Sequence, residues 1–138
     1  MDYKEPKIIQ LPKIVDPRGN LSVIEGEANI PFGIKRTYWI YDVPGGMNRL
    51  GHAFRKQEEF IVALSGSFDV VLHDGEKETR YHMSRSYYGL YVPPMMWRSI
   101  DNFSTNSVVF VLSSETYDPS DYIEDFDEFL NVLKHQEL

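Results

Sequence analysis

The chain of 138 residues contains no cysteine, which excludes disulfide bonds, thiol nucleophiles and thiolate metal sites. Basic residues are also few, since 14 lysines and arginines stand against 21 aspartates and glutamates and give a formal net charge of −7. Because nucleic-acid backbones are held by clustered basic side chains, this balance argues against nucleic-acid binding. A local basic pocket for one phosphorylated ligand is still compatible with it.

Long apolar runs are missing as well. No stretch approaches the roughly 18 apolar residues of a membrane span, and the first ten residues, MDYKEPKIIQ, lack the basic segment and apolar core of a secretory signal. We therefore expect no membrane association and a cytoplasmic location. The hydrophobic content of 42% is that of a folded globule, and the length suits one domain covering residues 1–138.

Short runs that favour β-structure recur between turn signals, of which Asp74-Gly75 is the strongest hairpin signal. This pattern predicts an all-β fold, a barrel or sandwich with one face of each strand turned inward. The expected strands are Lys7–Leu11, Asn20–Glu25, Ile34–Tyr41, Glu59–Ser65, Phe68–Leu72, Glu78–Met83, Gly89–Val92 and Ser107–Ser113.

Only the C-terminal end reads differently. From Asp121 to Gln136 the apolar residues follow helical spacing behind a Ser120/Asp121 cap, which predicts one amphipathic helix. Its apolar face is expected to contain Tyr122, Ile123, Phe126, Phe129, Leu130 and Leu133.

One of the four histidines stands in a short stretch that reads as a strand. Arg49–Phe54 has the sequence RLGHAF, and residues two apart in a strand point to the same face, so His52 and Phe54 project together. We expect both to point into the barrel. The other histidines have ordinary structural positions in a hairpin, a polar strand and the last helical turn: His73, His82 and His135.

This stretch resembles the first of the two motifs that supply metal ligands in cupins. The first motif is present as Gly46, His52, Phe54, Glu58 or Glu59, and Gly66, and the second as Gly89, Pro94, Arg98 and Asn102. Phe54 and Arg98 stand where two of the three histidines of the pattern would be. Because a phenyl ring has no donor atom and a guanidinium does not deprotonate, we predict that the protein holds no metal.

Five blocks in order make the resemblance narrower. The whole chain is similar to the sugar 3,4-ketoisomerases of the cupin class, which act on a dTDP-linked 4-keto-6-deoxyhexose. The resemblance implies a jelly-roll barrel without a cofactor, and a homodimer with exchanged strands that holds the nucleotide-sugar in the barrel mouths. The matching blocks are DPRGNLSVIE at 16–25, IPFGIKRTYWIYD at 30–42, LSGSFDVVLHDG at 64–75, GLYVPPMMW at 89–97 and SETYDPSDYIEDFDEF at 114–129.

The resemblance also implies roles for single residues. His52 matches the first histidine of the family's His-Ala-His, which is taken as the base that moves the proton between C3 and C4 of the sugar. Phe54 matches the second, so any hydrogen bond from that position is absent. Arg98 occupies a position that varies between histidine and arginine, and this variation is associated with the C4 configuration of the product.

Other residues match positions near the nucleotide-sugar: Arg18 and Arg49 are similar to arginines there, and Arg36 and Tyr38 fall in a block that lines the same cavity. The candidate catalytic residues are therefore His52, Arg98 and Tyr38. The candidate substrate-binding residues are Arg18, Arg36, Arg49, Glu59 and Trp97.

The chemistry of a C4-to-C3 carbonyl shift suits these residue types. An imidazole with a pKa of about 6.5 can remove the C3 proton and return it to C4, and Arg98 or the Tyr38 hydroxyl can stabilise the enediolate between these steps. We therefore expect an isomerase of deoxy- and amino-sugar biosynthesis that acts on dTDP-4-keto-6-deoxyglucose. Phe54 keeps two alternatives open: a catalytically silent cupin that binds a nucleotide-sugar, and a related sugar epimerase or dehydratase.

Overall fold

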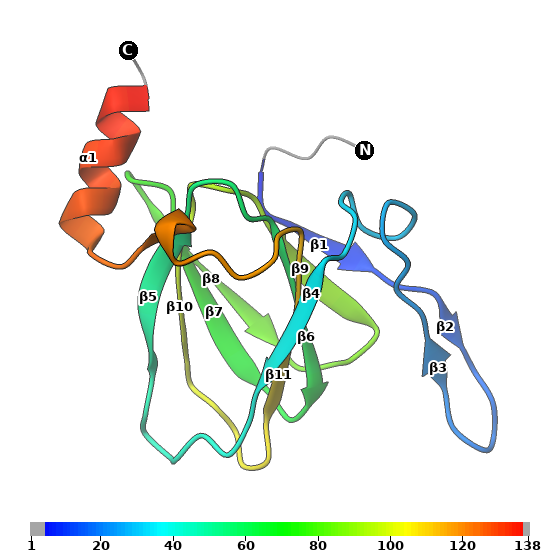
Figure 1. Cartoon of the computed structure of the whole chain (residues 1–138). Coiled ribbons are helices and arrows are strands. Elements are labelled where there is room, and N and C mark those ends of the chain that lie inside the picture. The colour runs from blue at the N-terminus through cyan, green and yellow to red at the C-terminus, as the bar shows by residue number, and fades with distance from the viewer. Residues whose placement is uncertain (1–4, 137–138) are drawn as a thin grey trace.

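Two five-stranded antiparallel sheets face each other in the computed structural model, which describes residues 5–136 apart from the side chain of Leu50 (Figure 1). Each sheet turns one face toward a shared interior, so that the pair forms a flattened barrel. In the first sheet the strand order is β1 (Lys7–Gln10), β9 (Tyr88–Val92), β6 (Glu59–Ser65), β11 (Val108–Ser113) and β4 (Arg36–Ile40). In the second it is β12 (Tyr122–Ile123), β5 (Arg49–Phe54), β10 (Trp97–Asp101), β7 (Phe68–His73) and β8 (Glu78–Met83).

The prediction of an all-β fold with a C-terminal helix is confirmed. Strands β6 and β8 have the predicted bounds, and RLGHAF forms β5. Strand β10 is absent from the strands that the sequence predicts. Its sequence WRSID does not show the alternation of apolar and polar residues that indicates a strand, because the inward-facing Arg98 is charged.

The interior is built from alternate residues of the facing strands. Fully buried aliphatic side chains of β6, β7 and β11 meet there, including Ile61, Val70 and Val111. Burying each such side chain contributes about 1.5–3 kcal/mol relative to leaving it in water. Polar side chains of β4, β5, β6 and β10 instead line a cavity between the sheets.

The C-terminal helix begins later than the sequence predicts, so the prediction of a helix from Asp121 to Gln136 is wrong at its start. Helix α1 spans Phe126–Gln136, and a 3₁₀ turn at Pro119–Asp121 precedes β12. Ile123 is fully buried beside Ala53 of β5, with which it pairs in the second sheet. Pairing and burial in the sheet therefore outweigh the helical spacing of these apolar residues.

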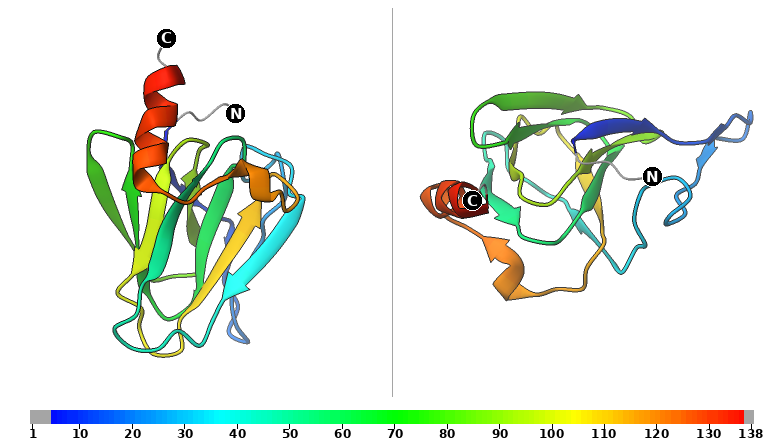
Figure 2. Two further views of the ribbon diagram at one scale, coloured as in Figure 1. Left: turned by 60° about the vertical axis from the view of Figure 1, so that its left-hand side comes forward. Right: turned by 90° about the horizontal axis from the view of Figure 1, so that it is seen from above.

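Helix α1 packs on the outer face of the second sheet (Figure 2). Its N-cap is Asp125, whose carboxylate accepts the backbone N–H of Asp127 at 3.1 Å, so the predicted Ser120/Asp121 cap is also wrong. Within residues 5–136, no helix has the length and apolar character needed to cross a membrane. The predicted apolar face of the helix is confirmed for the residues that pack against this sheet: Phe126, Phe129, Leu130 and Leu133.

The outer face of the first sheet is only partly covered. Ile30 and Phe32, in the connection between β3 and β4, pack over Phe60 and so bury one end of it. Toward the other end, Trp39 and Leu64 leave about half of their side-chain surface exposed around a groove of about 550 Å³.

A small hairpin projects from the barrel beside this face. It consists of β2 (Lys13–Ile14) and β3 (Leu21–Ser22), which pair with each other, and both views show it standing away from the two sheets (Figures 1 and 2). The predicted strand Asn20–Glu25 is present only as β3. Apolar side chains of the hairpin are exposed, among them Val15.

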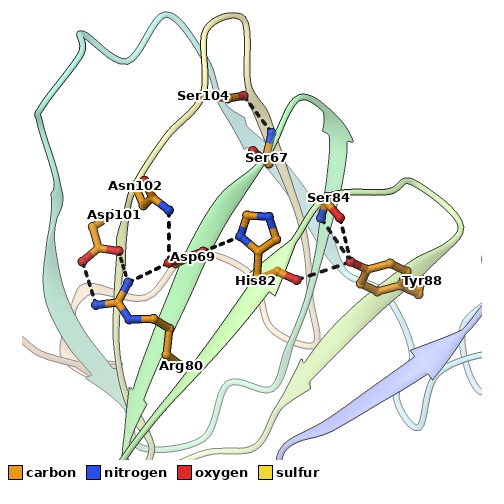
Figure 3. Close-up of polar contacts among 9 residues, drawn as sticks. All are labelled: Ser67, Asp69, Arg80, His82, Ser84, Tyr88, Asp101, Asn102 and Ser104. Carbon is orange, nitrogen blue, oxygen red and sulfur yellow. Dashed lines mark hydrogen bonds and ion pairs between the residues drawn. The ribbon is translucent and has the colours of Figure 1, made fainter.

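A polar cluster joins three strands on the outer face of the second sheet (Figure 3). The buried Asp69 carboxylate of β7 contacts His82 Nδ1 at 2.6 Å and accepts hydrogen bonds from Arg80 at 2.8 Å and Asn102 at 3.3 Å. Arg80 also pairs with Asp101 at 2.6 Å. The cluster therefore ties β8 at the sheet edge to β7 and β10.

Candidate active site

Polar side chains from strands of both sheets converge on a cavity of about 920 Å³ between the sheets. We call it the central cavity. Its walls include six of the residues that the sequence predicts for the site: Arg36, Tyr38, Arg49, His52, Glu59 and Arg98. They come from β4, β5, β6 and β10. In β4 the two site residues are two positions apart and share a face, whereas Arg49 and His52 of β5 are three apart, and an irregularity in the register of β5 against β10 lies between them.

His52 is held in an aromatic environment. Its imidazole lies edge-on to the Phe54 ring, with 5.0 Å between ring centroids, and 5.6 Å from the Tyr122 ring. Phe54 is fully buried and contacts Tyr122 in turn at 4.5 Å. The prediction that His52 and Phe54 share the inward face is therefore confirmed, and two rings restrict the orientation of the imidazole.

Glu59 is the acceptor on which the donors of the central cavity converge. One carboxylate oxygen accepts from Arg98 Nη1 at 2.6 Å, and the other accepts from the Tyr38 hydroxyl at 2.5 Å and from Gln57 Nε2 at 2.8 Å. The neighbouring Glu58 instead accepts from Tyr91 at 2.5 Å and does not line the cavity. Of the two glutamates that fit the first sequence motif, Glu59 is therefore the one in the site.

Tyr38 stays protonated in this arrangement. Burial raises the pKa of the Tyr38 hydroxyl well above its usual value, and the negative charge and hydrogen bond of Glu59 raise it further, while Arg98 opposes the rise. The hydroxyl therefore acts as a hydrogen-bond donor at neutral pH, and its proton is directed at Glu59.

Arg98 is a buried cation with a buried counter-ion. Only 3% of its side chain and 1% of the Glu59 side chain are exposed. Its Nη2 donates to the Met96 carbonyl at 3.0 Å, and its guanidinium lies over the Phe54 ring at 5.0 Å. Arg98 faces His52 in the register of β10 and β5, so the buried ion pair stands beside the imidazole.

Arg36 belongs to the same network through a residue that the sequence does not single out. Its Nη2 donates to Gln57 Oε1 at 3.2 Å, and its guanidinium lies between the rings of Tyr38 and Tyr117, at 5.2 and 5.5 Å. Gln57 is buried and bridges Arg36 to Glu59. No motif marks Gln57, because it lies in the turn before β6 and gains its partners only through folding.

Tyr122 is a second wall residue that sequence reasoning does not place in the site. The spacing of residues 121–136 assigns it to a helix face, whereas it lies in β12 and faces His52. The matched block at 114–129 includes Tyr122 and is the one signal that could have drawn attention to it.

Trp97 is not among the residues that line the central cavity. It neighbours Arg98 in β10 and therefore points to the opposite face, where its indole contacts Phe126 and Phe129 of helix α1 at 5.3 and 5.8 Å. The indole also lies against Gly51, where a Cβ atom would overlap it. The structure thus gives Trp97 a packing position between sheet and helix.

Arg18 is also distant from the central cavity of its own chain. It lies at the tip of the β2–β3 hairpin, where its side chain is 90% exposed and pairs with Asp16 at 2.9 Å. This pairing raises the pKa of Arg18 and lowers that of Asp16.

The donor set of the central cavity is poorly suited to a metal ion. Within the described part of the chain, no group of three histidine, aspartate or glutamate side chains is placed to hold one. Phe54 supplies no ligand atom, and the Glu59 carboxylate is already committed to Arg98, Tyr38 and Gln57.

A family model, a curated relative and solved structures all match most of this chain. The family model described as "FdtA: WxcM-like, C-terminal" matches residues 4–134. A TDP-4-oxo-6-deoxy-alpha-D-glucose-3,4-oxoisomerase of Aneurinibacillus thermoaerophilus is 43% identical over 129 residues, which cover 94% of this chain and 93% of the relative.

Solved structures agree with this similarity. The WlaRB TDP-quinovose 3,4-ketoisomerase of Campylobacter jejuni is 39% identical, with a TM-score of 0.89 over 94% of this chain and 99% of that one. The sugar 3,4-ketoisomerase QdtA of Thermoanaerobacterium thermosaccharolyticum, solved in complex with TDP, is 33% identical, with a TM-score of 0.93 over 98% of both chains.

Proposed function

Because the chain belongs to the FdtA family of WxcM-like C-terminal domains, we propose that it is a dTDP-sugar 3,4-ketoisomerase. Its substrate is dTDP-4-keto-6-deoxy-D-glucose, and its product is a dTDP-3-keto-6-deoxyhexose for deoxy- and amino-sugar biosynthesis in the cytoplasm. The observation that carries the proposal is the imidazole of His52, which lies in a cavity of nucleotide-sugar size beside a paired arginine and glutamate.

The reaction needs one base for the C3 proton and polar groups that stabilise the negative charge on the C4 oxygen. His52 removes the proton from C3, and the electron pair forms the C3–C4 double bond of an enediolate as the C4 carbonyl oxygen takes up negative charge. The imidazolium then returns a proton to C4 as the C3–O bond becomes the new carbonyl, and the proton of the C3 hydroxyl passes through water to the C4 oxygen. Atoms and charge balance without a redox partner, and one positioned base accounts for about 10²–10⁴-fold of the rate.

The cationic side chains have separate roles in this proposal. Arg36 and Arg49 line the cavity and suit the pyrophosphate, since guanidinium groups bind phosphate oxygens through paired hydrogen bonds. Arg98 is buried in an ion pair with Glu59, so a positive and a negative charge stand beside His52 in fixed positions. Phe54 holds the imidazole through ring contact and offers no second titratable group.

Conversion of the purified substrate tests the function directly. The protein is incubated with dTDP-4-keto-6-deoxyglucose, and the carbonyl position of the sugar is followed by ¹³C NMR. A new C3 carbonyl signal is expected. A sugar that stays unchanged while the protein binds it would identify a silent nucleotide-sugar-binding cupin, and a product that keeps its C4 carbonyl would identify an epimerase or dehydratase.

The proposed assembly is a homodimer with exchanged hairpins. A monomer leaves apolar side chains exposed on two surfaces, the β2–β3 hairpin with Val15 and Leu21 and the outer face of the first sheet with Trp39 and Leu64. Because both surfaces belong to one chain, a twofold axis can bring each hairpin onto the partner's sheet. Such an exchange would also carry Arg18 away from its own barrel, which suits its proposed contact with substrate in the partner's cavity.

A further inference from the structure

The donors that the sequence predicts for the enediolate, on Tyr38 and Arg98, are either engaged by other groups or buried. A tyrosine hydroxyl has one proton to donate, and that of Tyr38 is given to Glu59 at 2.5 Å. Arg98 directs Nη1 to Glu59 and Nη2 to the Met96 carbonyl, and its Nε, which has no hydrogen-bond partner among the described residues, is buried. An oxygen that becomes negatively charged in the central cavity therefore needs another donor, because removing one such donor typically costs about 10²–10³-fold in rate.

The Tyr122 hydroxyl meets this need. Tyr122 lines the central cavity, and its ring is tilted by 36° to the imidazole of His52. Among residues 5–136, the structure contains no hydrogen bond from the Tyr122 hydroxyl to another residue. A phenolic O–H is a hydrogen-bond donor, so this hydroxyl can donate to an oxygen in the central cavity.

The position of Tyr122 is fixed by several contacts on either side of it. The buried carboxylate of Asp121 accepts the backbone N–H groups of Lys56 at 2.8 Å and Gln57 at 3.1 Å. Arg55 donates its backbone N–H to the Asp121 carbonyl at 3.0 Å and its guanidinium to the Tyr122 carbonyl at 3.3 Å. These contacts attach β12 to the turn between β5 and β6, so the strand that carries His52 and the one that carries Tyr122 are held together.

The electrostatic environment agrees with this geometry. Burial and Glu59 are the main reasons that the pKa of Tyr38 is raised, and Tyr122 adds to the rise. The two phenols therefore lie close enough to influence each other. Tyr117 also lines the central cavity, but its side chain is mostly exposed and its ring contacts Tyr122 at 5.9 Å.

We propose that Tyr122 is a further catalytic residue, whose hydroxyl donates a hydrogen bond to the sugar oxygen that becomes negatively charged when His52 removes the C3 proton. The inference rests on the proposed ketoisomerase function. The hydroxyl keeps its proton throughout and stabilises charge on the C4 oxygen.

Tyr122→Phe tests the hydroxyl and keeps the ring that contacts His52. The matched control is Tyr81→Phe, which removes a phenol oxygen from β8 at the far edge of the second sheet, outside the central cavity. We expect Tyr122→Phe to lower kcat by about 10²–10³-fold with KM changed by less than about fivefold, whereas Tyr81→Phe behaves as the parent. Parental melting temperatures for both variants establish that they fold.

A binding measurement keeps the inference separate from the function on which it rests. Calorimetry compares the affinity for dTDP-4-keto-6-deoxyglucose with that for dTDP, which lacks the sugar oxygens. Tyr122→Phe should lower the ratio of the two affinities about threefold to tenfold, the equivalent of one hydrogen bond.

Each outcome decides the matter. A loss of kcat, or a lowered affinity ratio, supports the role of Tyr122, while kcat and affinity ratio that both match Tyr81→Phe overturn it. A parent protein that binds the keto-sugar without isomerising it refutes the ketoisomerase function, and the affinity ratio alone then decides on Tyr122. A parent that binds neither ligand refutes both.

Discussion

At the scale of single residues, the buried ion pair of Arg98 and Glu59 dominates the energetics of the site. Two opposite charges with almost no solvent access stand 2.6 Å apart, and each has further polar partners. Removing one member leaves the other charge buried without its counter-ion, which typically costs about 3–5 kcal/mol, whereas replacing both with neutral groups costs much less.

Arg98→Met is therefore expected to lower the free energy of unfolding by about 3–5 kcal/mol. The double variant Arg98→Met/Glu59→Gln should be more stable than Arg98→Met alone, because the uncompensated carboxylate is gone. Urea unfolding of the parent, both single variants and the double variant measures this coupling. Additive losses would show that the pair contributes no more than two separate side chains.

At the scale of elements, the Asp69 cluster ties the edge strand β8 to the rest of the second sheet (Figure 3). Burial alone would raise the pKa of Asp69, but the hydrogen bonds from His82, Arg80 and Asn102 outweigh it and lower the pKa. A carboxyl group with a lowered folded-state pKa stabilises the fold above its unfolded-state pKa of about 3.9, and this stabilisation is lost as the pH falls through the folded-state value.

We expect Asp69→Asn to be about 1–3 kcal/mol less stable than the parent at pH 7, since hydrogen bonds to a charged group are lost. The difference should begin to shrink below about pH 4, where Asp69 becomes protonated in the unfolded chain, and should keep shrinking as the pH falls toward the lowered folded-state pKa. Denaturant unfolding between pH 7 and pH 3 measures it. Glu76→Gln, which neutralises an exposed carboxylate in the neighbouring hairpin, serves as the control. A stability difference that stays constant over this range would contradict the assignment.

The sequence predicts the local features of the elements better than the contacts between distant residues. The alternation in RLGHAF predicts both strand β5 and the shared inward face of His52 and Phe54, because the period of two is a local property. The ion pair of Arg98 is not predictable in this way, since its partner lies 39 residues away and the register of two sheets brings them together. The spacing of apolar residues predicts that Tyr122 lies on a helix face. In the structure Tyr122 lies in β12 instead, because burial of Ile123 in the sheet outweighs this helical spacing.

At the scale of the whole molecule, the proposed hairpin exchange predicts the effect of a charge on the exposed apolar surfaces. Leu21 of the hairpin is 53% exposed, and Leu21→Glu would place a carboxylate in the proposed interface. Thr79, an exposed residue of β8 in the second sheet, lies on neither of the two surfaces and does not line the central cavity, so Thr79→Glu introduces the same charge as a control.

Size-exclusion chromatography with light scattering gives the mass of each variant. The parent and Thr79→Glu are expected to be dimers, and Leu21→Glu is expected to shift toward the monomer, because burying an unpaired carboxylate opposes association. A monomeric parent, or a Leu21→Glu variant that dimerises as tightly as the parent, would contradict the exchanged-hairpin arrangement.

The central claim is that His52 moves a proton between C3 and C4 of the sugar, and deuterium transfer tests it most directly. Parent protein and His52→Asn are incubated with dTDP-4-keto-6-deoxyglucose in D₂O, and ¹H NMR follows the C3 and C4 positions, while calorimetry with dTDP verifies that the variant still binds the nucleotide. With the parent we predict a 3-keto product that carries deuterium at C4, because the proton on the His52 imidazolium exchanges with D₂O before C4 is protonated. With His52→Asn we predict neither product nor exchange at C3, with dTDP affinity within about threefold of the parent. Exchange and product formation by His52→Asn at the parental rate would contradict the account.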